Sequence, residues 1–232
     1  MNPNTVILLF TRDAAEEASK KLLHSEFSKH QNRLAFQYLI SHTFKEAEKS
    51  GIPVYVCLPE NQQGNTFGEK LSLAFQELYH KGFDNVIAVG NDCPELNSEL
   101  LKDASRNLEK YGTVLGPAKD GGTYLIGINE KFFCREKFAN IEWQTSSVFN
   151  QLLQLFKTDK SHVEILPELQ DIDDESDLSL FLHGKSFKQQ LPGIYQFFKS
   201  LIASCFSGFA NYFVPCSGYL PSSHLNQRGP PL

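Results

Sequence analysis

The sequence has few of the residue patterns that mark disulfide-rich, metal-thiolate or nucleic-acid-binding proteins. Its five cysteines form no CxxC pair and no metal-ligand spacing, so we expect reduced thiols rather than disulfides or a zinc site. The seven histidines contain no HxxxH or HxH pair. With 22 Lys and Arg against 27 Asp and Glu, the chain has no basic excess, and no nucleic acid is expected as its main partner.

A signal peptide is also not evident. The short apolar run from Val6 to Phe10 has no basic residues ahead of it, unlike the start of a secreted protein. We therefore expect a cytoplasmic location. The length of 232 residues favours one substantial domain with an appendage over two equal domains.

Apolar runs alternate with amphipathic stretches along most of the chain. The short runs are rich in β-branched residues and bounded by Gly, Pro or Asp, which favours strands at 5–10, 53–58, 85–90, 113–117, 123–128 and 162–166. Apolar residues at three- and four-residue intervals predict helices at 31–49, 68–80, 97–111, 145–156 and 175–182. This alternation predicts a three-layer α/β/α fold with a mostly parallel central sheet.

Polar clusters follow four of these strands, at the edge where a parallel sheet binds its ligands, and they contain Asp13, Asp92, Asp120, and Asp171 with Asp173. Asp92 follows the strand at 85–90, and Pro94 keeps the chain extended there instead of letting it enter a helix. Asp171 and Asp173 follow the last strand. Two distant carboxylates suit Mg²⁺ or Mn²⁺ that bridges phosphate oxygens, whereas an isolated aspartate after a strand often serves only a turn.

The stretch LGPAKDGGTYLIG, residues 115–127, places an acid and two adjacent glycines between two predicted strands. Paired glycines are entropically costly to order, so we expect a positive φ or a close backbone approach there. Two interpretations fit this pattern. The glycines form either a tight hairpin turn or a floor against which a small ligand lies.

Four motifs in order give the chain a specific resemblance to a known family. They are QQGNTFGEKL leading to GNDCPEL, TVLGPAKDGGTYLIGIN, IEWQTSSVFNQLL and ILPELQDIDDESDL. From about residue 6 to residue 182 the chain resembles the bacterial selenodomain-associated transferases. That family has the Rossmann-like nucleotide-diphospho-sugar transferase fold of the glycosyltransferase A type and is similar to molybdenum-cofactor and 2-phospholactate guanylyltransferases. The resemblance implies glycosyl or nucleotidyl transfer from a nucleotide or nucleotide-sugar donor to a small acceptor.

The resemblance also implies roles for individual residues. Asp92 and Asp173 would hold Mg²⁺ or Mn²⁺, and together with Asp120, which would hydrogen-bond to the sugar or acceptor, they are the expected catalytic residues. The expected substrate contacts are Gln63, Gly64, Gly68 and Glu69 near the nucleotide, Gly121, Gly122 and Thr123 at the acceptor, and Trp143 and Thr145 as a wall of the acceptor pocket. Core packing is an equally good interpretation of Trp143.

The stretch after the first strand departs from the family pattern. Family members carry a loop rich in proline and glycine that ends in Lys-Thr-Arg-Leu and cradles phosphates. Here TRDAAEEASKKLL contains no glycine and favours a continuous helix. Arg12 and Lys21 remain as expected phosphate contacts, with Lys21 at the family's arginine position, whereas Glu16 and Glu17 would repel a triphosphate. The alternative to an active transferase is therefore a weakened or inactive relative that acts as a binding or scaffold module.

The end of the chain, residues 186–232, lies outside the resemblance and is expected to extend a domain formed by residues 1–185. Residues 193–215 contain five phenylalanines and one charged residue, Lys199. We expect an amphipathic segment that packs on the domain or on a second subunit in a homo-oligomer. Attachment to a membrane surface is the alternative.

Overall fold

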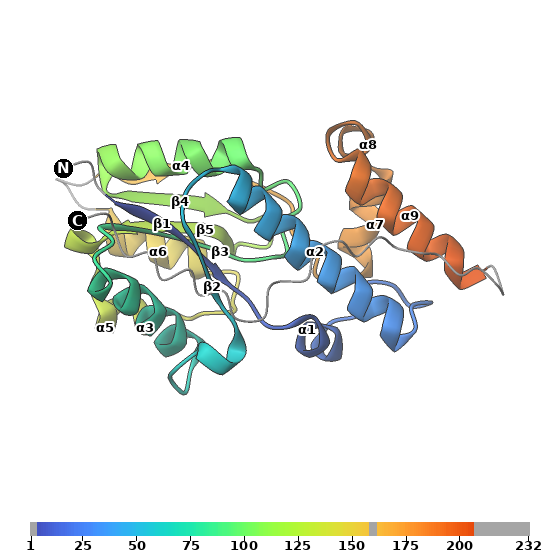
Figure 1. Ribbon diagram of the computed structural model, residues 1–232, viewed down its shortest axis with the longest axis horizontal. Coiled ribbons are helices and arrows are strands. Elements are labelled where there is room, and N and C mark those ends of the chain that lie inside the picture. Colours follow the sequence, from blue (N-terminus) through green and yellow to red (C-terminus); the bar gives the residue numbers. More distant parts are fainter. Residues whose placement is uncertain (1–3, 158–161, 207–232) are drawn as a thin grey trace.

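A six-stranded sheet lies at the centre of the computed structural model, which describes residues 4–157 and 162–206 (Figure 1). The strand order is β2-β1-β3-β5-β4-β6. The strands are β1 Thr5–Phe10, β2 Val54–Cys57, β3 Asn85–Val89, β4 Thr113–Pro117, β5 Thr123–Asn129 and β6 Glu164–Ile165. All six predicted strands are therefore confirmed, and the last is shorter than predicted.

Strand direction in the sheet is mostly parallel, as predicted. β1 runs parallel to both β2 and β3, and β6 runs parallel to β4. Only β5 among these six strands is antiparallel to its neighbours, β3 and β4. This exception follows from the short loop between β4 and β5, since a hairpin joins antiparallel strands whereas parallel strands need a longer crossover.

Helices cover both faces of the sheet (Figure 1). Alternate residues of a strand point to opposite faces, so Val6 and Leu8 pack toward one layer and Ile7 and Leu9 toward the other. The first layer contains α3 Phe67–His80, α5 Arg135–Ala139 and α6 Val148–Phe156. The second contains α2 Lys29–Lys49 and α4 Ser98–Tyr111. Two short 3₁₀ helices, Pro59–Asn61 and Glu130–Phe132, lie in the connections. The three-layer prediction is confirmed.

A third hydrophobic core lies beyond one end of the sheet, where helices pack on helices (Figure 1). It joins the first half of α2 to α1 Ala14–Lys20, α7 Glu175–His183 and α9 Pro192–Phe206, and α8 Lys185–Gln190 lies between the last two. Tyr38 of α2 stacks on Phe197 of α9 with ring centroids 3.9 Å apart. The described part of the aromatic tail therefore packs on the domain, and the remainder of the predicted segment lies outside the described residues.

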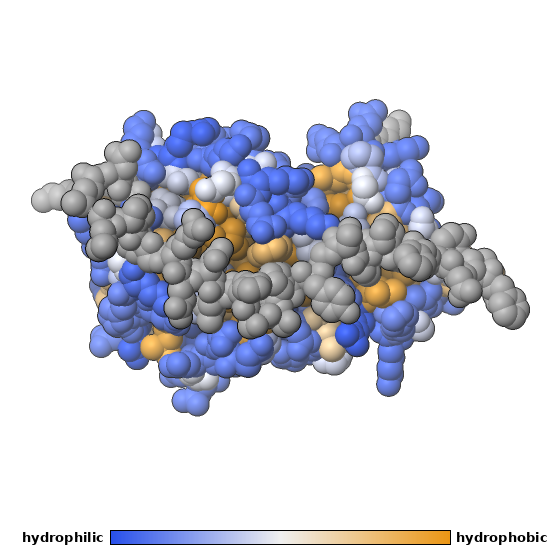
Figure 2. Space-filling view, in the orientation of Figure 1, coloured by the Kyte–Doolittle hydropathy of each residue, from blue (hydrophilic) through white to orange (hydrophobic). Residues whose placement is uncertain are grey.

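The outer surfaces of the helices are mostly hydrophilic on the face shown in Figure 2, and apolar side chains are visible in the gaps between them. Such a pattern is expected for helices that bury one apolar stripe. Within the described residues, no helix combines the length and the hydropathy needed to cross a membrane.

Candidate functional site

The carboxyl ends of β1 and β3 lie side by side, where the chain order in the sheet reverses. From β1 the chain continues to β2 on one side and later to β3 on the other. The hydroxyl of Thr11, directly after β1, donates a hydrogen bond of 3.0 Å to Oδ1 of Asn91, directly after β3. In open α/β sheets, ligands bind in the crevice outside the strand ends at this kind of reversal. Topology therefore marks the ends of β1 and β3 as the candidate site.

Asp92 and Asp173, 81 positions apart in the sequence, lie close enough here to interact electrostatically. The backbone N–H of Ile172 donates a hydrogen bond of 2.9 Å to the carbonyl oxygen of Asp92, which fixes the loop before α7 against the end of β3. Removal of the Asp92 carboxyl from water and the nearby charge of Asp173 raise the pKa of Asp92 to about 6. The structure thus brings together the two acids that the sequence predicts as a pair.

Asp171 adds a third acid to this position. Its side chain is buried, at 6% exposure, and burial together with the charges of Asp120, Asp92 and Asp173 raises its pKa to about 7. Asp120, from the β4–β5 loop, is therefore close enough to act on it electrostatically. Asp171 is absent from the set that the resemblance implies, although its position after the last strand already marked it in the sequence as an acid at this edge.

Lys21 supplies positive charge among these acids. Its Nζ lies 2.5 Å from Oδ1 of Asp173 and 3.9 Å from Oε2 of Glu17. Burial lowers the pKa of Lys21, but the charges of Asp92, Asp173 and Glu17 outweigh burial, and the net shift is upward. We call Lys21, Asp92, Asp120, Asp171 and Asp173 the charged edge.

The segment between β1 and Lys21 forms a helix, as its composition predicts, and not a phosphate-cradling loop. Asp13 caps α1 by accepting hydrogen bonds of 2.8 Å from the backbone N–H groups of Ala15 and Glu16. Arg12 pairs with Glu16 at 3.6 Å and with Glu17 at 3.4 Å. The first-turn donors and Arg12 are therefore already bonded within the chain.

The chemistry of the charged edge is suited to a divalent cation. Asp92 and Asp173 offer the hard oxygen ligands that Mg²⁺ and Mn²⁺ accept, and burial together with the nearby charge of Asp173 raises the pKa of Asp92. Among residues 4–157 and 162–206, no three acidic, His or Cys side chains form a complete metal cluster. An ion held here would therefore complete its coordination with water or with phosphate oxygens, as Mg²⁺ commonly does.

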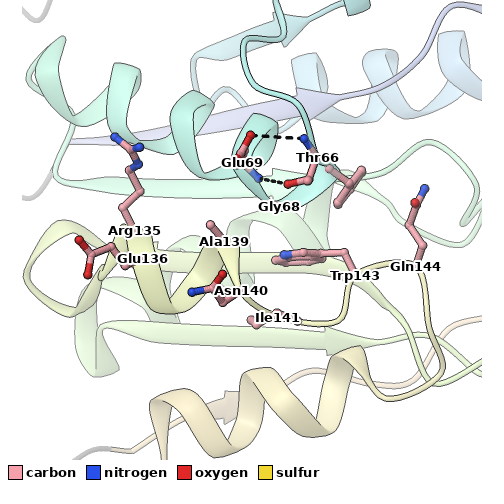
Figure 3. A pocket seen from close by; sticks show the side chains of 11 residues that line it. Thr66, Gly68, Glu69, Arg135, Glu136, Ala139, Asn140, Ile141, Trp143 and Gln144 are labelled. Atoms are coloured by element: carbon pink, nitrogen blue, oxygen red, sulfur yellow. Dashed lines mark hydrogen bonds between the residues drawn. The ribbon is translucent and has the colours of Figure 1, made fainter.

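A separate groove lies beside the start of α3, with a volume of about 560 Å³ (Figure 3). We call it the α3 groove, and three predicted substrate contacts, Gly68, Glu69 and Trp143, line it. The indole N–H of Trp143 donates to the carbonyl oxygen of Phe138 at 3.1 Å, and its ring packs on Phe67 and Phe138. Trp143 is thus used in packing, which was one of its two interpretations. A side chain at Gly68 would overlap the Trp143 ring and the carbonyl of Ala139.

The motif around Gly64 and Glu69 caps α3. Thr66 accepts a hydrogen bond of 3.1 Å from the N–H of Glu69, and the Glu69 carboxylate accepts from the N–H groups of Asn65 and Thr66 (Figure 3). This reciprocal arrangement is a capping box. Gly64 has φ +117°, which favours glycine.

Gln62, the neighbour of the predicted substrate contact Gln63, connects the strand ends. The Gln62 side chain donates to the carbonyl of Thr11 at 2.9 Å and to that of Cys57 at 3.1 Å. Gln63 is exposed and lines a smaller cavity of about 410 Å³ along α3. Both residues are glutamines, so the sequence alone does not distinguish which of them makes these contacts.

The paired glycines form a hairpin turn between β4 and β5. Gly121 has φ +89°, and a side chain there would overlap the carbonyl of Ser146. The N–H of Gly122 donates to Asp120 at 2.7 Å. The hairpin interpretation of the glycines is therefore confirmed, and their contact with a ligand stays a prediction.

Thr123, the first residue of β5, and Thr145, before α6, lie in different environments. Thr123 Oγ1 is buried and has no hydrogen-bond partner within the described residues. Thr145 Oγ1 donates to the carbonyl of Glu142 at 2.7 Å and closes the turn before α6. This turn delays the start of α6 to Val148, later than the predicted 145.

Comparison with solved structures identifies the fold. The structure is similar to a candidate nucleotide-diphospho-sugar transferase from Desulfovibrio desulfuricans G20, with a TM-score of 0.75, 23% identity, and 88% of this chain and 97% of that chain covered. It is also similar to Rv0371c from Mycobacterium tuberculosis H37Rv, with a TM-score of 0.50, 12% identity and coverage of 79% and 100%. The chain thus has the nucleotide-diphospho-sugar transferase fold.

Comparison with sequences identifies the family. A search of curated proteins finds no match. The profile of DUF2064, described as "Uncharacterized protein conserved in bacteria", matches residues 26–145, slightly more than half of the chain. The matched range contains Asp92 and Asp120 but not Lys21 or Asp173. Membership among the selenodomain-associated transferases stays a prediction, whereas the profile match shows that the chain belongs to the DUF2064 family.

Proposed function

We propose that the chain is a nucleotide-binding transferase and that the charged edge binds the phosphates of a nucleotide or nucleotide-sugar donor. The observation that carries this proposal is the convergence of Asp92, Asp173 and Lys21 at the reversal point between β1 and β3. Burial there raises the pKa values of Asp92 and Asp171, so the folded chain keeps carboxylates together at an energetic cost. Such an arrangement is typical of a site that receives a cation or a positively charged group.

Each residue of the charged edge has a defined role in this proposal. Asp92 and Asp173 would hold Mg²⁺ or Mn²⁺, which when bound neutralises charge on a leaving phosphate. The Lys21 ammonium would neutralise a phosphate oxygen, while Asp120 and the hydroxyl of Thr123, which has no hydrogen-bond partner among the described residues, would orient a small acceptor at the β4–β5 turn. Transfer would take place either at the sugar carbon or at the α-phosphorus.

A non-catalytic binding module is the second candidate, and α1 favours it. Asp13 uses the first N–H groups of α1, and Glu16 and Glu17 engage Arg12, so these groups do not face a phosphate. Loss of a preorganised donor to a developing charge lowers catalytic rates by about a hundredfold or more. The charged edge would then bind a nucleotide without rapid turnover.

Calorimetric titration of the full chain tests the proposal. A panel of nucleoside diphosphates, triphosphates and nucleotide sugars is titrated with and without Mg²⁺ into the wild type and Asp92→Asn. We expect metal-dependent binding that weakens at least about tenfold in Asp92→Asn, because the substitution removes a carboxylate from the edge. Asp103→Asn is the matched control, since Asp103 is an exposed residue of α4 paired with Arg106.

The outcomes separate the two candidates. Binding with release of a transferred or hydrolysed product supports the transferase, and binding without turnover supports the module. The absence of binding across the panel, or equal effects of Asp92→Asn and Asp103→Asn, would contradict the proposed site.

A further inference from the structure

We infer that Lys21 is an internal counter-cation that competes with a divalent ion for Asp173, and that it leaves this carboxylate when a diphosphate binds. The inference deepens the proposed function and rests on it for the identity of the charged edge as a cation and phosphate site. It concerns which cation, Lys21 or the divalent ion, pairs with Asp173 before and after a diphosphate binds. Lys21 then acts as a positioning residue that makes binding of the metal and of the diphosphate depend on each other.

The position of the Lys21 ammonium carries the first step. Nζ lies 2.5 Å from Asp173 Oδ1, within the range of a direct charge-assisted hydrogen bond. The same ammonium lies 3.9 Å from Oε2 of Glu17, so it stands between two carboxylates. A divalent ion that binds Asp173 would therefore meet a positive charge beside the same carboxylate, and the two cations repel each other.

The backbone of Lys21 is fixed, so its side chain must make the adjustment. Asn32, buried in α2, donates from Nδ2 to the carbonyl of Lys21 at 2.7 Å and to that of Ala18 at 3.1 Å, and accepts from the N–H of Leu23 at 3.1 Å. These bonds hold the turn after α1 against α2. The long, flexible lysine side chain can still redirect its ammonium from a carboxylate to a phosphate.

This arrangement predicts coupling between two ligands. A diphosphate offers Lys21 a new anionic partner and leaves Asp173 to the metal. Each ligand therefore raises the affinity for the other by the same factor. In the absence of phosphate, Lys21 keeps the affinity for free metal low.

Binding of Mn²⁺ alone to the full-length, nucleotide-free protein tests the inference. The loss of the free Mn²⁺ signal in electron paramagnetic resonance gives the dissociation constant for the wild type and for Lys21→Met. We expect Lys21→Met to bind Mn²⁺ roughly tenfold more tightly, because the competing charge is gone. Lys20→Met is the matched control, since neighbouring Lys20 pairs with Glu16 and should leave the Mn²⁺ affinity unchanged.

A double variant and a polar variant complete the experiment. Asp92→Asn combined with Lys21→Met should not show the tighter Mn²⁺ binding expected of Lys21→Met alone. That loss would show that the additional Mn²⁺ affinity depends on the Asp92–Asp173 pair. If Lys21→Met does not fold, Lys21→Gln removes the charge while keeping a hydrogen-bond donor, and the same gain is expected.

The result that overturns the inference is unchanged or weaker Mn²⁺ binding when the charge of Lys21 is removed. Because no nucleotide is present, this outcome is independent of the calorimetric panel. Tighter Mn²⁺ binding together with no nucleotide binding would support the competition and contradict the proposed function. Nucleotide binding by the wild type, without tighter Mn²⁺ binding in Lys21→Met, would support the proposed function and contradict the competition.

Discussion

The charged edge and the glycine motifs are both marked by the sequence, but they differ in how their polar groups are satisfied. In the glycine motifs, hydrogen bonds and close contacts within the chain account for the glycines and the polar residues. Glu69 and Thr66 cap α3, and Gly121 makes room for the carbonyl of Ser146. At the charged edge, burial and mutual repulsion raise the pKa values of Asp92 and Asp171, and Lys21 compensates only part of the negative charge.

This difference teaches that a glycine motif can serve folding as well as binding. A glycine with positive φ or without space for a side chain has a sufficient structural reason for its presence. A buried acid with a raised pKa has no such reason, because it lowers stability at neutral pH. The charged edge is therefore the stronger candidate for function, and substitutions in the two regions should change stability in opposite directions.

The largest effect is expected at the hairpin, for Gly121→Ala. The new side chain would both require an unfavourable positive φ and overlap the Ser146 carbonyl. We expect the free energy of unfolding to fall by about 3 kcal/mol or more, as measured by urea denaturation.

Gly51→Ala is the matched control for this change. Gly51 also has a positive φ, +76°, but has open space where a side chain would lie. Gly51→Ala should lower the free energy of unfolding by only about 1 kcal/mol. Equal losses at the two positions would show that contact with Ser146 does not require the glycine.

An opposite change in stability is expected for Asp171→Asn at the charged edge. The raised pKa means that folded Asp171 holds its proton between about pH 4 and 7, where the unfolded carboxyl has lost it. The contribution of Asp171 to wild-type stability should therefore fall across this range as the pH rises. At pH 8 Asp171→Asn should be about 2 kcal/mol more stable than the wild type, and near pH 4 the two should be equal.

Denaturation midpoints measured from pH 4 to 8 check this prediction. Asp103→Asn provides a comparison, because Asp103 is exposed and lies outside the charged edge. If the stability of Asp171→Asn and of the wild type changes with pH in parallel, the pKa of Asp171 is not raised in the folded chain and this prediction is wrong.

The smallest effect is expected at the start of α3, for Thr66→Ala. The substitution removes the oxygen that accepts from the N–H of Glu69, and loss of such a cap costs about 1 kcal/mol of unfolding free energy. Thr66→Ser keeps the oxygen and should remain close to the wild type in urea denaturation. If Thr66→Ala instead left stability unchanged and abolished nucleotide binding, the motif would belong to the binding site.

Much of the fold could be predicted from the sequence because its signals are local. Short β-branched runs gave the six strands, and the alanines and glutamates after Phe10 gave α1. The rule for strand ends also brought Asp92 and Asp173 to the same edge of the sheet. These predictions needed only periodicity, helix propensity and the geometry of parallel strands.

The rest of the site depends on contacts between distant segments. The ion pair of Lys21 and Asp173 joins residues 152 positions apart, and Asn32 of α2 fixes the turn that presents Lys21. Burial of Asp171 likewise depends on the complete fold. For Gly121 the sequence correctly indicated a close approach of backbone, but could not show whether the approaching group was a ligand or Ser146.

Anomalous diffraction from crystals containing Mn²⁺ and inorganic pyrophosphate tests the central claim most directly. The account predicts a manganese peak beside the carboxylates of Asp92 and Asp173, with the Lys21 ammonium moved from Asp173 to a phosphate oxygen. A manganese peak and pyrophosphate bound in the α3 groove, with the Lys21–Asp173 pair intact, would contradict it.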